Sequence, residues 1–468
     1  MKHKLIVTLI LLASALPMIA QQSDTTEQQV ISLSLQEALD YAVKHNYTIL
    51  NADLDVKKAK WQIWQTTAMG LPQVNGSVKY QQYPDIPTQL MPNFIAPAVY
   101  QINTESFGLQ PIAPPPDPNS KFPVQFGSEY NMSWGVSVNQ LIFSGEYIVG
   151  LQASRIFKDL AETNKEKSVR DLRASVEQTY VLALIALESE RIIKETYNNT
   201  VDLRDKTKQL IEAGMGEPTQ LDQMNLVLTQ LDNQLKSIER QTDITLRLLK
   251  FQLGIDFQDS LVMTTTLDDL VQNMKLGDVI NRDFSLQKNL DYKLVMTQEE
   301  LKKLDMRREE AKMLPQVMGF YTYSKNAMRD EFNFQDPDQP WYKTSFYGVQ
   351  INIPIFGSGS KIASVAQKKI EYDKAQNNRA MMEQQLNIQY QQALNGFINA
   401  YEKMLNSQHN INLAQKVYEN TKIKYQNGSA SSLELTQAQN QYLQAQGDYY
   451  SAMMELVKAK TDLDKLVY

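Results

Sequence analysis

The chain has 468 residues, contains no cysteine and carries a formal net charge of −6 at pH 7. The absence of cysteine excludes disulfides, thiol nucleophiles and a lipid anchor attached to cysteine. The acidic balance argues against nucleic acid as a partner, because binding to phosphate requires a basic face.

The first 20 residues have the pattern of a secretory signal peptide. A basic start precedes an apolar stretch from Leu5 to Leu16, which is too short to cross a bilayer as a helix. Ala20 is followed by the polar residue Gln21, so we expect cleavage after Ala20. Retention of the stretch as an uncleaved anchor is the alternative.

Two strands are predicted next, at about 73–83 and 126–143. Between Tyr130 and Asn139 large apolar residues alternate with small polar ones. This pattern fits a membrane β-barrel strand with its apolar face toward lipid, although one half-buried strand of a soluble sheet would also show it. The intervening segment from Pro84 to Pro123 is rich in proline, so we expect a long loop without regular structure.

Two long helices are predicted to follow, at about 146–213 and 218–252, separated by a turn at Gly214. The first would extend about 100 Å at 1.5 Å per residue, which no compact globular domain accommodates. The second carries apolar residues at heptad spacing, and this feature alone would favour a coiled-coil rod or tether. The heptad positions are Leu221, Met224, Leu228, Leu231, Leu235, Ile238, Thr242, Thr245 and Leu249.

A second copy of the same pattern occupies residues 283–468, which indicates an internal duplication of residues 21–254. Its strands are predicted at about 316–324 and 345–356, and its helices at about 360–426 and 432–467. Residues 255–282 between the copies include a short β-like run. We expect them to form an equatorial linker packed on the outside of the helices.

Short motifs recur in the same order in both copies. Each copy enters its first strand through Leu-Pro-Gln-Val, at Leu71 and again at Leu314. Each second strand ends in phenylalanine and a glycine-containing turn, and each return helix starts its heptad pattern seven residues after a turn glycine, Gly214 or Gly428. The two copies therefore share register as well as pattern.

With these doubled motifs and the opening run from Leu33 to Leu39 followed by Asn46, the chain resembles the TolC family of outer-membrane efflux proteins over nearly all of its mature length. The resemblance implies a mainly α-helical fold with a membrane β-barrel contribution. In that fold, duplicated helix-strand-strand-helix-helix units assemble as a homotrimer. The trimer has one 12-stranded β-barrel and a long periplasmic α-helical barrel.

Elementary physics supports the oligomer independently. Four strands cannot close a barrel, because the smallest membrane barrels have about eight strands and an open edge in lipid leaves backbone groups unpaired. Two chains would give eight strands and an interior filled by side chains, whereas three chains would give twelve strands and leave a lumen. A conduit therefore favours three chains.

The resemblance also implies the function and the partners. We expect the exit duct of a tripartite efflux pump that exports small molecules such as drugs. It would lie in the cell outer membrane, in contact with lipid, with its helices in the periplasm. Its partners would be a periplasmic adaptor (membrane fusion) protein and an inner-membrane pump of the RND or ABC type. The alternatives are an exit duct for type I protein secretion and a structural envelope-spanning coiled coil.

No enzymatic site is predicted. Of the three histidines, one lies in the signal segment and the other two are His45 and His409, far apart in the sequence. No glycine-rich phosphate loop and no Gly-x-Ser-x-Gly elbow occurs. We therefore expect no cofactor and no metal site.

The resemblance places the adaptor-docking tips at the two turns between the long helices. Small residues there would let a partner approach the backbone closely. Turn chemistry explains the same glycines, because glycine ends a helix and Pro218 starts the next one at its first position. The predicted tip residues are Gly214, Met215 and Gly216 in the first copy and Gly428, Ser429 and Ala430 in the second.

The resemblance places a periplasmic gate at Glu434, Gln437, Tyr425 and Gln220. Acidic residues at the Glu434 position narrow the closed entrance in the family, and Tyr425 matches a tyrosine whose partner position is Gln220. Two departures, the uncharged Gln220 and Ala430 in place of an arginine, predict an easily opened gate. Glu434 also fits a capping box with Ser431, and both roles can coexist.

Overall fold

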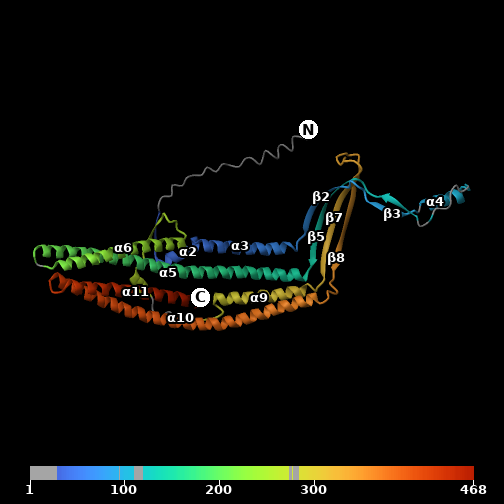
Figure 1. The fold of residues 1–468 in the computed structure, drawn as a ribbon. Coiled ribbons are helices and arrows are strands. Elements are labelled where there is room, and N and C mark those ends of the chain that lie inside the picture. Colours follow the sequence, from blue (N-terminus) through green and yellow to red (C-terminus); the bar gives the residue numbers. More distant parts are fainter. Residues whose placement is uncertain are drawn as a thin grey trace. The chain divides into compact units, whose positions relative to one another are not determined.

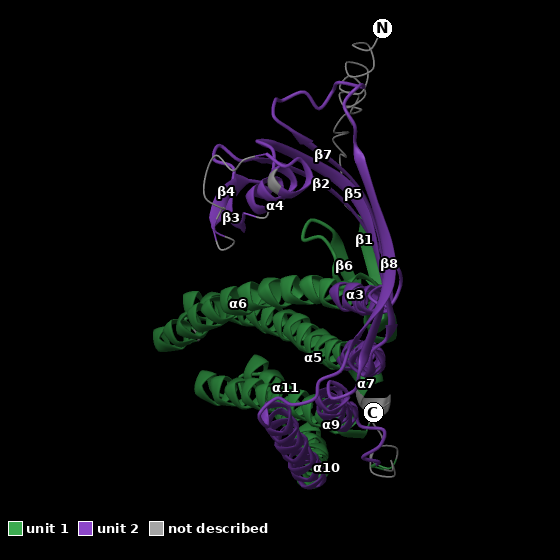
Figure 2. Cartoon of the chain, turned by 90° about the vertical axis from the view of Figure 1, so that its right-hand side faces the viewer, with its two compact units in different colours: residues 1–50, 168–284, 388–468 green, residues 51–167, 285–387 purple. Residues whose placement is uncertain are grey.

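A computed structural model describes residues 29–93, 95–109, 117, 120–214, 216–273, 277 and 284–467. The predicted signal peptide, Met215 and most of the proline cluster between 110 and 119 lie outside the described residues. The chain separates into two compact units (Figure 2). Unit 1 comprises residues 1–50, 168–284 and 388–468, and unit 2 comprises residues 51–167 and 285–387.

Among the described residues, no helix is both long enough and apolar enough to cross a membrane.

Unit 2 contains a four-stranded antiparallel sheet in the order β2-β5-β7-β8 (Figure 1). Strand β5 begins later than predicted because Gly127 adopts a φ of 133° in the preceding turn. Strand β8 ends earlier than predicted because Pro354 has no N–H to donate to a ladder. The strands are β2 (Gln73–Gln82), β5 (Tyr130–Phe143), β7 (Gln316–Arg329) and β8 (Tyr342–Asn352).

The register places the predicted apolar residues of all four strands on one face of the sheet. Val138 lies opposite Val74 on one side and Tyr321 on the other, and Tyr321 lies opposite Tyr347. Because directly opposite residues share a face, an apolar row crosses the whole sheet. Val74 is 66% exposed and Tyr347 is 85% exposed, so the described residues leave this part of the face uncovered. At the other end of the sheet Phe332 contacts Tyr80 and Tyr130 on the same face.

The opposite face is mainly polar, but it carries apolar residues that the sequence pattern did not indicate, among them Leu141, Met318 and Met328. Phe320 and Phe346 lie on it and make an edge contact, with ring centroids 6.1 Å apart. Gly348 makes room for this arrangement, because a Cβ atom there would lie 2.8 Å from Cζ of Phe320. The polar face therefore carries an aromatic pair beside one edge strand.

The prediction of a long loop without regular structure between Pro84 and Pro123 is wrong. Proline is compatible with the elements found because Pro92 and Pro123 lie in a two-stranded ribbon, where each strand has an unpaired edge, and Pro97 lies in the first turn of a helix. The elements are β3 (Thr88–Pro92), α4 (Ile95–Gln101), the π-helix η1 (Ile102–Ser106) and β4 (Lys121–Gln125).

Helical segments complete unit 2, and the boundary between the units falls within three helices. Within unit 2, the Tyr147 hydroxyl donates to the Thr67 carbonyl over 3.1 Å, which joins two of these segments. Lys302 pairs with Glu371 at 3.0 Å and joins two others. The helices are α3 (Tyr47–Ala68), α5 (Gly145–Glu212), α9 (Leu290–Ala311) and α10 (Ser360–Gln426).

Unit 1 contains the remaining parts of α5 and α10 with the two return helices and a small parallel ribbon. The predicted linker at 255–282 contributes the ribbon strand β6, which pairs with β1, and the helix α7. Residues 274–276 and 278–283 of that linker lie outside the described residues. The elements are β1 (Val30–Leu33), α2 (Leu35–His45), α6 (Pro218–Leu253), β6 (Ser260–Met263), α7 (Leu267–Asn273) and α11 (Ser432–Val467).

The core of unit 1 follows the predicted heptad positions. The buried residues of α6 fall on them, and Leu253 extends the pattern by one step. Tyr180 is fully buried, and its hydroxyl donates to the Leu33 carbonyl over 2.9 Å. The other buried residues of α6 are Met224, Leu228, Leu231, Thr242, Thr245 and Leu249.

Residues of the opening motif, from Leu33 to Asn46, form a junction in unit 1. Ser34 and Glu37 build a capping box that starts α2. The Asn46 side chain donates to the Gln252 carbonyl over 2.8 Å, which ties the start of α3 to the end of α6. Gly254 ends α6 with a φ of 75°, and a Cβ atom there would lie 2.5 Å from the His45 carbonyl oxygen.

Candidate functional site

The predicted docking residues lie at two helix turns of unit 1, between α5 and α6 and between α10 and α11. Gly214 has a φ of 75° and Gly428 a φ of 70°, a left-handed conformation that favours glycine. The Gly428 N–H donates to the Tyr425 carbonyl, and the Ser429 N–H donates to the Lys424 carbonyl over 2.8 Å. The left-handed backbone conformation of the two turns is therefore sufficient to explain why glycine occupies both positions.

The space around the turns determines how closely a partner protein could approach them. A Cβ atom at Gly214 or Gly428 would have no neighbour within 4 Å, so the turn surfaces are open. Gly216 differs, because a Cβ atom there would lie 2.9 Å from the Ile211 side chain. Ser429 is exposed and Ala430 is partly buried.

Glu434 caps the helix that follows the second turn. Its carboxylate accepts from the Ser431 N–H over 2.7 Å and from the Ser431 hydroxyl over 3.0 Å. The Ser431 hydroxyl oxygen accepts in turn from the Glu434 N–H over 3.2 Å. These two hydrogen bonds from Ser431, the backbone one first, hold the pKa of the exposed Glu434 carboxyl below its usual value. The capping box is therefore formed.

Tyr425 has a different partner from the one that the resemblance implied. Its hydroxyl shares a hydrogen bond of 2.8 Å with the Thr207 hydroxyl on α5. Thr207 is buried and donates to the Leu203 carbonyl one turn away. The partly buried side chain of Gln220 makes no hydrogen bond within the described part of the chain. The structure thus brings Tyr425 to Thr207 and not to Gln220.

A small apolar cluster joins the two helix hairpins just below the turns. It takes one buried residue from each of four helices: Leu203, Met224, Tyr418 and Leu435. Tyr418 stacks on Tyr442 with ring centroids 5.7 Å apart and an interplanar angle of 1°. Desolvation of the buried phenol raises the pKa of Tyr418 to about 12, so this residue stays neutral at physiological pH.

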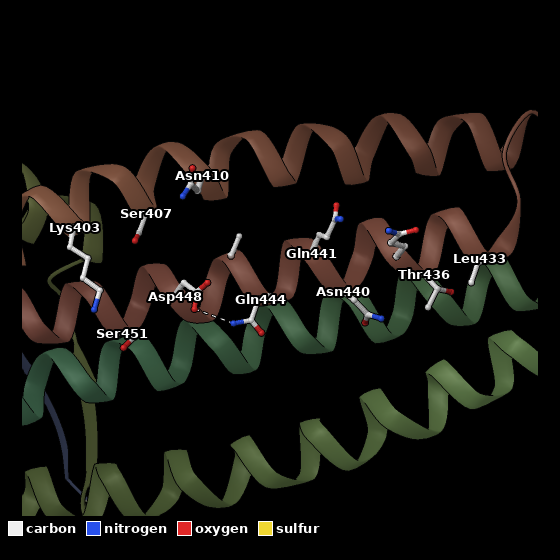
Figure 3. Close-up of a pocket in the computed structure, with 12 residues that line it drawn as sticks. Lys403, Ser407, Asn410, Leu433, Thr436, Asn440, Gln441, Gln444, Asp448 and Ser451 are labelled. Atoms are coloured by element: carbon white, nitrogen blue, oxygen red, sulfur yellow. Dashed lines mark hydrogen bonds between the residues drawn. The ribbon is translucent and has the colours of Figure 1, made fainter.

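A groove with a volume of about 900 Å³ runs along α10 and α11 (Figure 3). Gln437 is one of its lining residues. Its walls are mainly amide and hydroxyl side chains, and Gln444 donates to Asp448 over 3.1 Å within it. At one end Lys403 pairs with Glu455 at 2.6 Å. Among the other lining residues are Ser407, Asn410, Thr436, Asn440, Gln441 and Ser451.

Because amide and hydroxyl groups both donate and accept, the groove could form hydrogen bonds with a polar surface.

Within the described ranges, no group of three or more histidine, aspartate or glutamate side chains is arranged to hold a metal ion. The sequence indicated Gln437 but not the rest of the groove, because amide and hydroxyl residues on a long helix ordinarily mark a solvated face.

Comparison with known proteins gives matches in sequence and in structure. Residues 297–467 match the model of the outer membrane efflux protein family. The chain is 22% identical over 318 residues to the proteases secretion protein PrtF of Dickeya chrysanthemi. That match covers 66% of this chain and 63% of PrtF, less than two thirds of the relative's length.

Two solved structures have a similar fold. The CmeC outer membrane channel of Campylobacter jejuni matches with a TM-score of 0.67 and 17% identity, covering 92% of this chain and 85% of CmeC. The open state of the MtrE outer membrane channel of Neisseria gonorrhoeae matches with a TM-score of 0.66 and 14% identity, covering 92% of this chain and 88% of MtrE. The similarity therefore extends over both units.

Proposed function

Since residues 297–467 belong to the outer membrane efflux protein family and 92% of the chain shares the fold of outer-membrane channels, we propose that this chain is the outer-membrane subunit of an efflux exit duct. The duct would carry small molecules such as drugs out of the cell. The mature protein lies in the cell outer membrane, with its long helices in the periplasm.

The two-faced sheet is the observation that carries this proposal. Its apolar face is exposed, as a lipid-facing surface requires, and its other face is mainly polar, as a lumen requires. The order β2-β5-β7-β8 leaves β2 and β8 as open edges. Open edges cannot persist in lipid, so β2 of one copy would pair with β8 of the next, and three copies would close twelve strands around a lumen.

The proposed partners follow from the family. Its members work with adaptor and inner-membrane components in tripartite pumps or secretion systems. We assign the two helix turns of unit 1 to a periplasmic adaptor and propose an inner-membrane pump of the RND or ABC type. A second candidate function, type I protein secretion, is favoured by the similarity to a proteases secretion protein. A passive duct needs no catalytic group and no cofactor.

Reconstitution tests the duct directly. We expect native mass spectrometry of the purified protein to report three subunits and planar bilayers to show stepwise conductance. A stable monomer, or a trimer that does not conduct, would contradict the proposal and favour a structural coiled coil. Purification of the native complex, with identification of its inner-membrane component, decides between efflux and type I secretion.

Bulky substitution at the second turn tests adaptor docking. Ser429→Trp places a large side chain on an exposed turn position without changing Gly428, whose left-handed conformation glycine favours. We expect a folded, membrane-inserted trimer that no longer restores drug resistance to a strain lacking the channel. Ser429→Ala is the matched control and should restore resistance fully. Full resistance with Ser429→Trp would assign the turn to chain reversal only.

Neutralisation of Glu434 tests the gate. Three carboxylates around one axis attract cations, so Glu434→Gln should reduce cation selectivity, measured as the reversal potential in planar bilayers. Glutamine keeps an acceptor oxygen for Ser431, so the turn should remain intact. An unchanged reversal potential would leave capping as the role of Glu434.

The direction in which pH changes the stability contributed by the Glu434 cap follows from the pKa of its carboxyl. The pKa of Glu434 is lowered in the folded protein by its hydrogen bonds to Ser431. Its contribution to stability is therefore present above the ordinary carboxyl pKa and is lost as the pH falls through the lowered pKa.

A further inference from the structure

Two lysines lie directly opposite each other on the apolar face of the sheet. Lys325 of β7 lies opposite Lys343 of β8, and on its other side opposite Trp134 of β5. The same register gives the row next to it Val136, Tyr323 and Ser345, so the lysines interrupt a largely apolar surface. Like charges directly opposite each other destabilise a strand pair.

No acidic side chain of the sheet offsets these charges. The strands β2, β5, β7 and β8 contain no aspartate and no glutamate. Neither lysine forms an ion pair with any described residue. Lys325 is partly buried, with its ammonium 5.6 Å from the centre of the Trp134 ring, and Lys343 is exposed.

The other basic residues of the sheet do not share this environment. Lys79 lies opposite Ser133 and therefore on the polar face. Arg329 is buried, and its guanidinium donates to the carbonyls of Met328 and Pro340. The lysine pair is thus a distinct feature of the apolar face.

Assembly of three copies would not supply a counter-charge. The edge strand β8 would meet β2 of the next copy, and β2 carries no acidic residue. An anion that offsets these charges would therefore come from outside the strands. Lipid headgroups supply anions at a lipid-facing surface.

The position of the pair along the strands agrees with headgroup depth. Lys325 is four residues from the end of β7, about 13 Å at 3.3 Å per residue. Aromatic side chains gather at that end, where Phe332 makes edge contacts with Tyr80, Tyr130 and Phe334. Aromatic residues concentrate where a membrane meets water, and lysine side chains near that level reach the headgroups.

We propose that Lys325 and Lys343 together bind the phosphate of an anionic lipid headgroup, with Trp134 packed beside it. This inference rests on the proposed function, because it requires the apolar face to contact lipid. One phosphate between two ammonium groups would remove their repulsion. The site would therefore prefer anionic over zwitterionic lipid.

Native mass spectrometry of the detergent-solubilised trimer tests the site with phosphatidylglycerol and with phosphatidylcholine as probes. We expect phosphatidylglycerol to bind preferentially, and K325Q/K343Q to weaken that binding roughly thirtyfold, given about 1 kcal/mol per lysine near an anionic surface. K79Q, on the polar face, should change it less than about twofold, well under the loss of one such contribution. K325R/K343R should retain it.

Equal binding of phosphatidylglycerol to wild type and K325Q/K343Q would overturn the proposal, and so would equal binding of the two lipids. Adding an excess of inorganic phosphate distinguishes a lipid headgroup from free phosphate as the source of the bound anion. If it displaces the lipid completely and itself binds with the same dependence on the two lysines, the site is a free-anion site and the lipid assignment fails. Conductance is recorded for each variant. A conducting wild type with unselective lipid binding refutes the site alone, whereas a non-conducting wild type refutes the duct.

Discussion

Replacing Val136 by proline is expected to abolish assembly of the proposed membrane-inserted trimer. Val136 lies in the central strand β5, opposite Gly76 on one side and Tyr323 on the other. Proline has no N–H, so a neighbouring carbonyl would lose its donor, and its ring would distort the ladder. In lipid each unsatisfied backbone group costs several kcal/mol because no water replaces the lost partner.

Gel filtration and native mass spectrometry of detergent extracts would measure this loss. Val136→Thr is the matched control, because threonine keeps the N–H and the β-branched shape and should assemble. Val349→Pro, within the edge strand β8 and opposite Gly319, is expected to prevent assembly as well. A normal yield of trimer with Val136→Pro would mean that β5 is not a central strand of the assembled barrel.

Replacing Gly254 by alanine should cause the largest loss of stability from a single methyl group. Gly254 and Gly214 share a φ of 75°, so alanine at either position incurs the cost of the left-handed conformation, about 1 kcal/mol. At Gly254 the added Cβ atom would also lie 2.5 Å from the His45 carbonyl oxygen, whereas at Gly214 it would meet nothing within 4 Å.

The difference in the free energy of unfolding between the two variants measures the cost of the steric overlap alone. Forcing extra atoms into a packed site typically costs about 1 to 3 kcal/mol, so Gly254→Ala should lower the free energy of unfolding by about 2 kcal/mol more than Gly214→Ala. Thermal unfolding of the detergent-solubilised proteins, followed by circular dichroism, measures this difference. Equal midpoints would show that the junction between α2 and α6 relaxes without cost.

The sequence predicted best those features that repeat at a fixed period. Alternation along β5 identified the apolar face, because side chains on a strand must point alternately to the two faces. Heptad spacing identified the buried face of α6, because positions three and four residues apart share one side of a helix. Both inferences need only local geometry.

Features that depend on residues far apart in the chain were not predictable in this way. The pairing of β1 with β6 joins segments about 230 residues apart, such as Val30 and Ser260. Neither segment contains a residue pattern that identifies the other as its partner. Thr207, the hydrogen-bond partner of Tyr425, is one of many threonines on helices. The ribbon between β2 and β5 was missed because its prolines suggested a loop, although an edge position tolerates them.

The open edges of β2 and β8 also determine how the stability of this protein must be measured. An isolated chain would expose Val74 at 66% and Val349 at 61%, together with a row of unpaired backbone groups at each edge. If these surfaces are buried only between copies and lipid, folding and association form one equilibrium. The melting temperature should then rise with protein concentration by mass action, and dilution alone should favour unfolding.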